Sequence, residues 1–76
     1  MEHYRTRDKK EAIVLFAADC ELDYPMKDAK GIVTFLFMDK YKCESLVNDH
    51  YAGRLSANTT RIMEAMDRVN TMLYRK

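Results

Sequence analysis

The sequence lacks several features that would identify a broad class of protein. Its 76 residues include only two cysteines, Cys20 and Cys43, which could form at most one disulfide bond. No segment reaches the roughly 18 to 20 apolar residues of a membrane-spanning helix. The opening Met-Glu-His-Tyr-Arg is not the apolar run of a signal peptide. We therefore expect a soluble, cytoplasmic protein that has no membrane contact and keeps its thiols reduced.

A strong charge excess is also missing. The chain has 13 basic and 12 acidic residues, a net charge of +1, whereas a dedicated nucleic-acid binder usually carries a larger positive excess. Both ends of the chain are basic, while residues 11–23 are acidic. The composition thus disfavours nucleic-acid binding without excluding it. A chain of this length has room for one domain, residues 1–76, with one modest core.

Residue patterns typical of catalytic or metal sites are absent too. The nearest candidates are Cys43 and His50, which would share one face of a helix but lie about 10.5 Å apart along its axis. A nucleophile and its base must be within hydrogen-bonding reach, and zinc ligands must lie about 2.0 to 2.3 Å from the metal. Neither Cys-x-x-Cys nor His-x-x-x-His spacing occurs. We expect no enzyme activity, no cofactor and no metal site.

The first regular element that the sequence predicts is a helix over residues 9–20. Asp8 and Glu11 have the spacing of a capping box, in which the aspartate accepts from a backbone N–H and the glutamate reaches back to the cap. Apolar residues spread around most of the circumference, so this helix should be covered on more than one side. A strand over 13–16 is the competing interpretation, but the cap and the alanines favour a helix.

A β-hairpin is expected next. Alternating apolar and polar residues predict a strand over 21–26, and Pro25 places it at an edge because proline cannot donate to a ladder. Residues 27–31 form a turn whose Gly31 can take a positive φ angle. Residues 31–38 then form a strand with apolar side chains on both faces.

Two more helices complete the predicted fold. One runs over residues 40–52 after the cap Asp39, and the other runs over 57–74. In the last helix, six apolar residues fall within an arc of about 120°, the width of a core-facing stripe: Ile62, Ala65, Met66, Val69, Met72 and Leu73. The predicted fold class is α+β, in the order helix, β-hairpin, helix, helix, with a two-stranded antiparallel sheet packed by helices.

The strand over 31–38 also predicts the assembly state. A two-stranded hairpin alone is only marginally stable, and a strand that is apolar on both faces needs more cover than one amphipathic helix supplies. We therefore expect a homodimer in which apolar surface is buried between the subunits.

Arginine recurs at intervals of seven toward the end of the chain, at Arg54, Arg61, Arg68 and Arg75. On a helix the last three drift by only about 20° per step, so they form one stripe. Together with Arg5 and Arg7, this arginine stripe could contact the phosphates of a nucleic acid or an acidic protein partner. The simpler interpretation is a solvated face, because Glu64 is spaced to pair with both Arg61 and Arg68.

The order strand, helix, helix over residues 32–74 matches that of a ribbon-helix-helix repressor, whose paired strands read bases in the major groove. Such a ribbon must present polar or basic side chains to the base edges. The predicted strand offers Val33, Phe35 and Phe37 on one face and mostly aliphatic side chains on the other. This fold is therefore disfavoured.

Single positions spread along the chain resemble a known family. They are Tyr4-x-Thr6-x-Asp8, Phe35-Leu-Phe37 followed by Asp39, Leu46-Val47, Tyr51-Ala-Gly53 and Ala57. In these positions the chain is similar to a small domain family of bacterial and phage genomes, domain of unknown function 5659. It departs from that family at Tyr24-Pro25 and at Val69-Asn70. The resemblance implies a compact domain of mixed helix and strand, encoded by a phage or another mobile element, and it implies no catalytic residues.

Two hypotheses about function follow from these patterns. The first is a non-enzymatic interaction module that binds a protein partner, because catalytic constellations are missing and the chain carries more apolar surface than one small core can hide. The alternative is a nucleic-acid-binding accessory protein that uses the arginine stripe of the last helix and the basic N-terminal segment.

Overall fold

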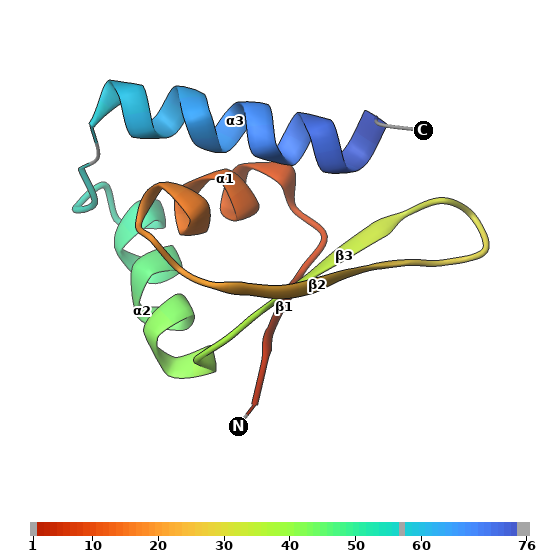
Figure 1. The fold of residues 1–76 in the computed structure, drawn as a ribbon. Helices are drawn as coiled ribbons and strands as arrows, with labels where there is room; N and C mark the ends of the chain where they lie inside the picture. Colours follow the sequence, from red (N-terminus) through yellow and green to blue (C-terminus); the bar gives the residue numbers. More distant parts are fainter. Residues whose placement is uncertain (1, 57, 75–76) are drawn as a thin grey trace.

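The structure, a computed structural model, describes residues 2–56 and 58–74. In this part of the chain three strands and three helices follow one another (Figure 1): β1 Tyr4–Thr6, α1 Lys9–Ala17, β2 Leu22–Lys27, β3 Val33–Phe37, α2 Lys40–Tyr51 and α3 Thr59–Tyr74. The α+β class is confirmed, but the predicted element order lacks β1 and is wrong at that point. Arg75 and the predicted first residue of the last helix, residue 57, lie outside the described residues.

The sheet has three antiparallel strands in the order β1-β3-β2, so the predicted two-stranded sheet is wrong. The segment Tyr-Arg-Thr of β1 has neither the length nor the apolar alternation that predicts a strand. It becomes a strand by pairing with a segment far along the chain, through Tyr4 with Phe37, Arg5 with Leu36 and Thr6 with Phe35. Because β3 has a strand of its own chain on each side, it cannot pair with a second copy as a repressor ribbon does.

β2 and β3 form the predicted hairpin, and β2 lies at the edge of the sheet as Pro25 indicates. Their ends differ from the predicted ones by at most two residues. In the turn, the Asp28 carboxylate accepts hydrogen bonds from the backbone N–H groups of Lys30 (2.8 Å) and Ile32 (3.0 Å). Gly31 has a φ of 84°, which glycine adopts without steric strain. The turn therefore holds β2 and β3 in register.

α1 lies at the centre of the molecule. Asp8 caps its N-terminus by accepting from two backbone N–H groups, and the helix ends at Ala17, three residues earlier than predicted. The competing strand over 13–16 is excluded. As the sequence predicts, α1 is covered on several sides, because α2 and α3 both pack against it and its Phe16 ring meets the Phe37 ring of β3 edge to face at 5.0 Å.

The hydrophobic core lies between the sheet and the helices. α1 and β3 supply most of its buried side chains: Ala12, Leu15, Phe16, Ala17, Val33, Phe35 and Phe37. α2 adds Cys43 and Val47, and α3 adds Ala65 and Val69. Met66, which the sequence places in the inward arc of α3, is 42% exposed. The reason is that α3 packs mainly on another helix, which covers a narrower strip than a sheet does.

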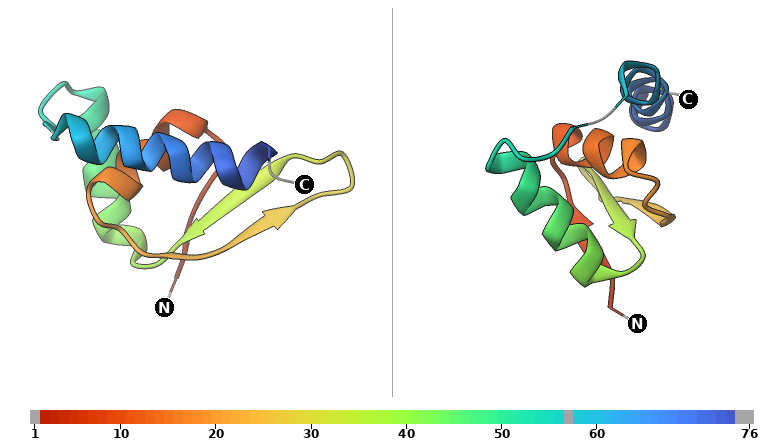
Figure 2. Two further views of the ribbon diagram at one scale, coloured as in Figure 1. Left: turned by 45° about the horizontal axis from the view of Figure 1, so that its top comes forward. Right: turned by 90° about the vertical axis from the view of Figure 1, so that its left-hand side faces the viewer.

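The helices cover one face of the sheet and leave the other uncovered (Figure 2). α1 lies against the sheet, α3 lies beyond α1, and α2 flanks the edge formed by β1. Leu36 is only 2% exposed, yet it is not part of the core cluster around α1, because it points to the uncovered side. On that side Ile32 is 44% exposed and Thr34 is half-buried. The sequence predicts that both faces of β3 are buried. The face toward the helices is fully buried, and the other face is only partly buried. No helix in the described residues is long and apolar enough to cross a membrane.

Candidate interaction site on the open sheet face

We call the side of the sheet opposite the helices the open face. Its side chains come from all three strands and the residue after β1: Arg5, Arg7, Tyr24, Met26, Thr34 and Leu36. Residues paired across neighbouring strands point to the same side of a sheet. The register therefore places Leu36 between Arg5 and Tyr24 in one row.

A second row lies next to the first. Thr34 pairs with Met26 of β2, and on its other side the Arg7 Nε donates a hydrogen bond to the Thr34 Oγ1 at 3.3 Å. Between the two rows is a hollow of about 330 Å³, lined by the open-face residues of β1 and β3, Met26, Arg7 and Thr6. Two guanidinium groups and no carboxylate line this hollow. It combines positive charge with an apolar floor.

The apolar side chains of the open face are partly accessible. Tyr24 and Met26 are each 49% exposed, and they stand beside the buried Leu36. The Tyr24 ring lies edge to face with the His3 ring at 6.3 Å. The His3 Nε2 is 2.6 Å from the Asp23 Oδ2, so this contact joins β2 to the residues before β1. Tyr24 is thereby held in place at one end of the open face.

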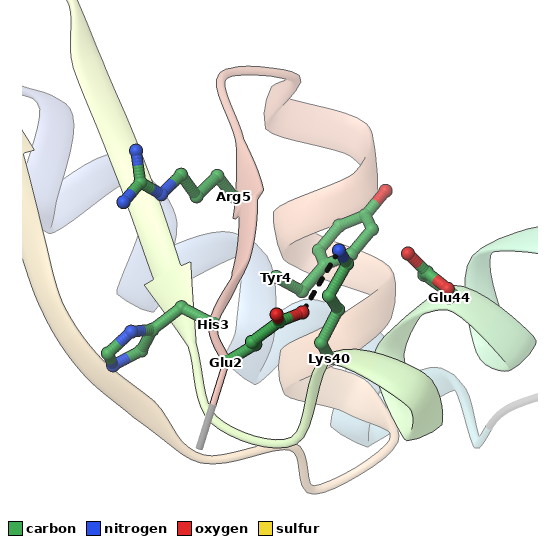
Figure 3. A pocket seen from close by; sticks show the side chains of 6 residues that line it. All are labelled: Glu2, His3, Tyr4, Arg5, Lys40 and Glu44. Atoms are coloured by element: carbon green, nitrogen blue, oxygen red, sulfur yellow. Dashed lines mark hydrogen bonds and ion pairs between the residues drawn. The ribbon is translucent and has the colours of Figure 1, made fainter.

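A larger hollow of about 620 Å³ lies at the start of the chain, around β1 and the first turn of α2 (Figure 3). Figure 3 shows the Arg5 and His3 side chains on the sheet side of β1, whereas Lys40 and Glu44 lie toward α2. The Lys40 Nζ is 3.2 Å from the Glu2 Oε2, and this bond raises the pKa of Lys40. Opposite charges neutralise each other here, so the hollow favours no ligand of one sign.

Three hydroxyl groups converge on Glu11, which the sequence assigns to the capping box. The Tyr4 hydroxyl (2.7 Å) and the Thr6 hydroxyl (3.0 Å) donate to its Oε1, and the Tyr51 hydroxyl donates to its Oε2 at 2.6 Å. The predicted return of Glu11 to the cap is wrong, because the Asp8 backbone N–H donates to the Thr6 hydroxyl instead. Glu11 therefore ties β1 and α2 to α1.

These hydrogen bonds change the acidity of each group. Burial raises the pKa of Glu11, but the hydrogen bonds from the three hydroxyl groups outweigh it, and the net pKa is lowered. The bond to the Glu11 carboxylate raises the pKa of Tyr51 to about 12, and burial followed by the same carboxylate raises the pKa of Tyr4. At neutral pH both tyrosine hydroxyl groups therefore stay protonated, and the Glu11 carboxylate is ionised. This cluster has a structural role, because it connects β1 and α2 to α1. The sequence signal for it is the placement of Tyr4 and Thr6 two residues apart, which puts both on the same face of a strand.

Arg54, Arg61 and Arg68, the members of the arginine stripe that the structure describes, lie on the helical side, away from Arg5 and Arg7. Arg54 pairs with Asp49 at 3.1 Å, and Arg61 pairs with Asp19. The Arg68 guanidinium lies 4.3 Å from the centre of the Phe16 ring. Arg61 thus pairs with Asp19 and Arg68 stacks on Phe16, and among the described residues neither forms the ion pair with Glu64 that the sequence spacing permits. Among the candidate contact residues that the structure describes, Arg5 and Arg7 line one hollow and Arg61 and Arg68 line another. Sequence reasoning missed Tyr24 and Met26 beside Arg5 and Arg7.

The two thiols lie next to each other in the core. Cys43 is fully buried and Cys20 is 6% exposed, and the Cys43 Sγ donates to the Met38 carbonyl at 3.3 Å. Burial, and then the neighbouring Cys20 thiol, raises the pKa of Cys43 to about 12, and burial also raises the pKa of Cys20. Both stay protonated near neutral pH, as buried structural thiols do. Within the described residues, no group of three or more His, Cys, Asp or Glu side chains could hold a metal ion.

Comparison of the chain with protein-family models, with curated proteins and with solved structures finds no match. The resemblance to the bacterial and phage domain family therefore stays a prediction.

Proposed function

We propose that this protein is a non-enzymatic interaction module that binds a protein partner through its open face. The observation that carries the proposal is the one-sided sheet: the helices cover one face, and the other presents half-exposed Tyr24 and Met26 beside Leu36. Antiparallel sheets can face water on one side, but that side is then usually polar. An apolar and cationic open face is typical of a contact surface. A cytoplasmic location and a phage or mobile-element origin are part of the same proposal.

The partner is expected to dock on side chains rather than to add a strand. β2 carries Pro25 on the outer edge of the sheet, and proline has no N–H to offer a new strand. The opposite edge, β1, is flanked by α2, and the Lys40 backbone N–H donates to the Glu2 carbonyl there. Both edges are therefore poor templates for strand addition.

Two exposed methionines give a matched test of this proposal. Met26 lies on the open face, and Met63, which is 61% exposed, lies on α3. A photo-crosslinking amino acid at position 26 should capture a protein other than the chain itself from a lysate of the cells that encode it, whereas the same group at position 63 should capture no such protein. Met26→Glu should abolish capture by a second crosslinker at position 24, whereas Met63→Glu should leave it unchanged. Equal capture of that protein from positions 26 and 63 would overturn the proposal.

Nucleic-acid binding is a second proposal, and the structure changes which arginines would contact the phosphates. Arg54, Arg61 and Arg68 have internal partners, so Arg5 and Arg7 on the open face are the better phosphate contacts. A gel shift with single-stranded DNA tests it by comparing Arg5→Gln/Arg7→Gln with Arg61→Gln/Arg68→Gln. Binding that depends on the first pair alone would support the open face, and no shift at low salt would remove this alternative.

The predicted homodimer is a further proposal, and α3 offers the surface for it. Met63, Met66 and Tyr74 are 61%, 42% and 71% exposed, and with Asn70 they follow one another at intervals of three and four residues along one side of the helix. The Asn70 Oδ1 is buried and has no hydrogen-bond partner within the described residues. A second copy of α3 could cover this apolar strip, which we call the methionine strip.

A further inference from the structure

We propose that the segment recognised by the open face is acidic and apolar: its carboxylates pair with Arg5 and Arg7, and its apolar side chains lie on Tyr24 and Met26. This inference rests on the proposed function and adds the chemistry of the partner. It follows from the charge, the spacing and the size of the open face.

The arginines of the open face differ from Arg54, Arg61 and Arg68 in their partners, although Glu2 and Glu44 line the larger hollow beside Arg5. On the helical side, Arg54 and Arg61 have carboxylate partners and Arg68 stacks on an aromatic ring. Arg5 and Arg7 have no carboxylate partner in the part of the chain that the structure describes. A guanidinium group presents a planar set of donors that matches a carboxylate. Two such groups side by side therefore favour an anionic ligand.

The spacing of the charges and the apolar side chains suits an extended peptide. Arg5 and Arg7 are two residues apart on one face, about 6.8 Å along the strand direction, and neighbouring strands are about 4.8 Å apart. Adjacent side chains on one face of an extended peptide are also about 6.8 Å apart, so an acidic and an apolar side chain can follow each other at this spacing. Lying across the open face, such a peptide would place a carboxylate on an arginine and the next apolar side chain on Met26 or Tyr24. The flexible Met26 side chain can adapt to different apolar groups.

A second copy of the chain fits this face less well than a peptide does. Two open faces would bring four arginines together without a carboxylate between them. The three strands, of three, six and five residues, present only about 230 Å² in projection, whereas a stable dimer usually buries about 800 Å² on each partner. A short peptide needs less surface than a folded subunit. The occupant is therefore a peptide segment of another protein.

A single-stranded nucleic acid also fits less well. Proteins that bind it without sequence preference stack successive bases on several aromatic side chains. The open face offers Tyr24 alone, and its ring already lies edge to face with the His3 ring. The floor between the arginines is aliphatic, from Leu36 and Met26, which favours an apolar side chain over a base.

Nuclear magnetic resonance titration of the isotope-labelled protein tests this inference, since weak binding still shifts backbone signals. The probe is a peptide of the sequence Glu-Glu-Leu-Leu-Glu-Glu-Leu-Leu, which presents glutamate and leucine alternately on either face when extended. We expect shifts at the open face and not on α3, and binding that weakens as salt increases. The variant Arg5→Gln/Arg7→Gln should bind about tenfold more weakly, and Arg61→Gln/Arg68→Gln should bind as the original chain does.

Three further probes decide what part of the chemistry matters. A Lys-Lys-Leu-Leu repeat keeps the leucines and reverses the charge, a Glu-Glu-Ser-Ser repeat keeps the charge alone, and oligothymidine supplies phosphates. All three should bind more weakly than the acidic and apolar peptide. Tighter binding of oligothymidine at the open face would overturn the inference in favour of the nucleic acid, and so would probe binding that ignores Arg5 and Arg7.

The crosslinking experiment separates this inference from the proposed function. If Met26→Glu abolishes capture of the partner while Arg5→Gln/Arg7→Gln does not, the open face is the docking surface and the acidic partner is wrong. If neither variant changes capture, both proposals are overturned. Loss of capture in both variants, with capture retained in Met63→Glu, supports both.

Discussion

At the scale of single residues, Glu11 shows how one carboxylate can join three elements. Its two oxygens accept hydrogen bonds from two hydroxyl groups of β1, which precedes α1, and from one of α2, which follows it: those of Tyr4, Thr6 and Tyr51. Hydrogen bonds to a charged group are worth more than those between neutral groups. Removing the carboxylate should therefore loosen β1 and the end of α2 together.

We predict that Glu11→Gln lowers the free energy of unfolding by about 1 to 2 kcal/mol at neutral pH. The folded pKa of Glu11 lies below its usual value, so the folded state binds fewer protons than the unfolded state between the two values. The stabilisation is present above the ordinary glutamate pKa and is lost as pH falls through the folded pKa. Urea denaturation at neutral and acidic pH measures it. The exposed Glu64→Gln is the control, and an equal loss in both variants would contradict the prediction.

The buried thiols give a second prediction at this scale. Cys43 has a pKa of about 12 and Cys20 a raised pKa, so neither supplies thiolate at mildly alkaline pH. We expect the folded protein to react slowly with a disulfide reagent such as dithionitrobenzoate, and both thiols to react rapidly in concentrated guanidinium. The absorbance of the released thionitrobenzoate measures both rates. Equal rates in the two states would show that the thiols are accessible.

At the scale of elements, the sequence predicts what local patterning determines. The cap at Asp8, the proline at the sheet edge and the apolar arc of α3 each predict their element to within a few residues. β1 could not be predicted, because its three residues become a strand only through β3. Because β1 was not predicted, the candidate site was not predicted either. The strand β3 alone has two apolar faces, and the positive charge of the open face comes from Arg5 and Arg7 beside β3.

The hairpin turn allows a test of an element that the sequence does predict. Gly31 has a φ of 84°, and an added Cβ would meet only the Lys27 Cε at 3.7 Å. Gly31→Ala should therefore cost about 1 to 2 kcal/mol through backbone strain alone. Thermal unfolding measures it, with Ala29→Gly in the same turn as a control for flexibility. No loss of stability in Gly31→Ala would mean that the turn changes its conformation at little cost.

At the scale of the whole molecule, two surfaces lie on opposite sides of the fold. The sheet, which carries the open face, and α3, which carries the methionine strip, lie on either side of α1 (Figure 2). Contacts at one surface should therefore leave the other accessible. A homodimer formed through α3 could present two open faces at once, and two linked sites raise the apparent affinity for a partner with two matching segments.

The homodimer supplies the last prediction. Met63→Glu places a charge on the methionine strip, where two copies would bring it into an apolar contact at a large cost in desolvation. We expect sedimentation equilibrium to show the dimer mass for the original chain and for Met26→Glu, and the monomer mass for Met63→Glu. Folding of both variants is checked by circular dichroism, since both positions are exposed. A dimer that Met26→Glu dissociates would instead place the second copy on the open face, and a monomer at every concentration would remove the homodimer.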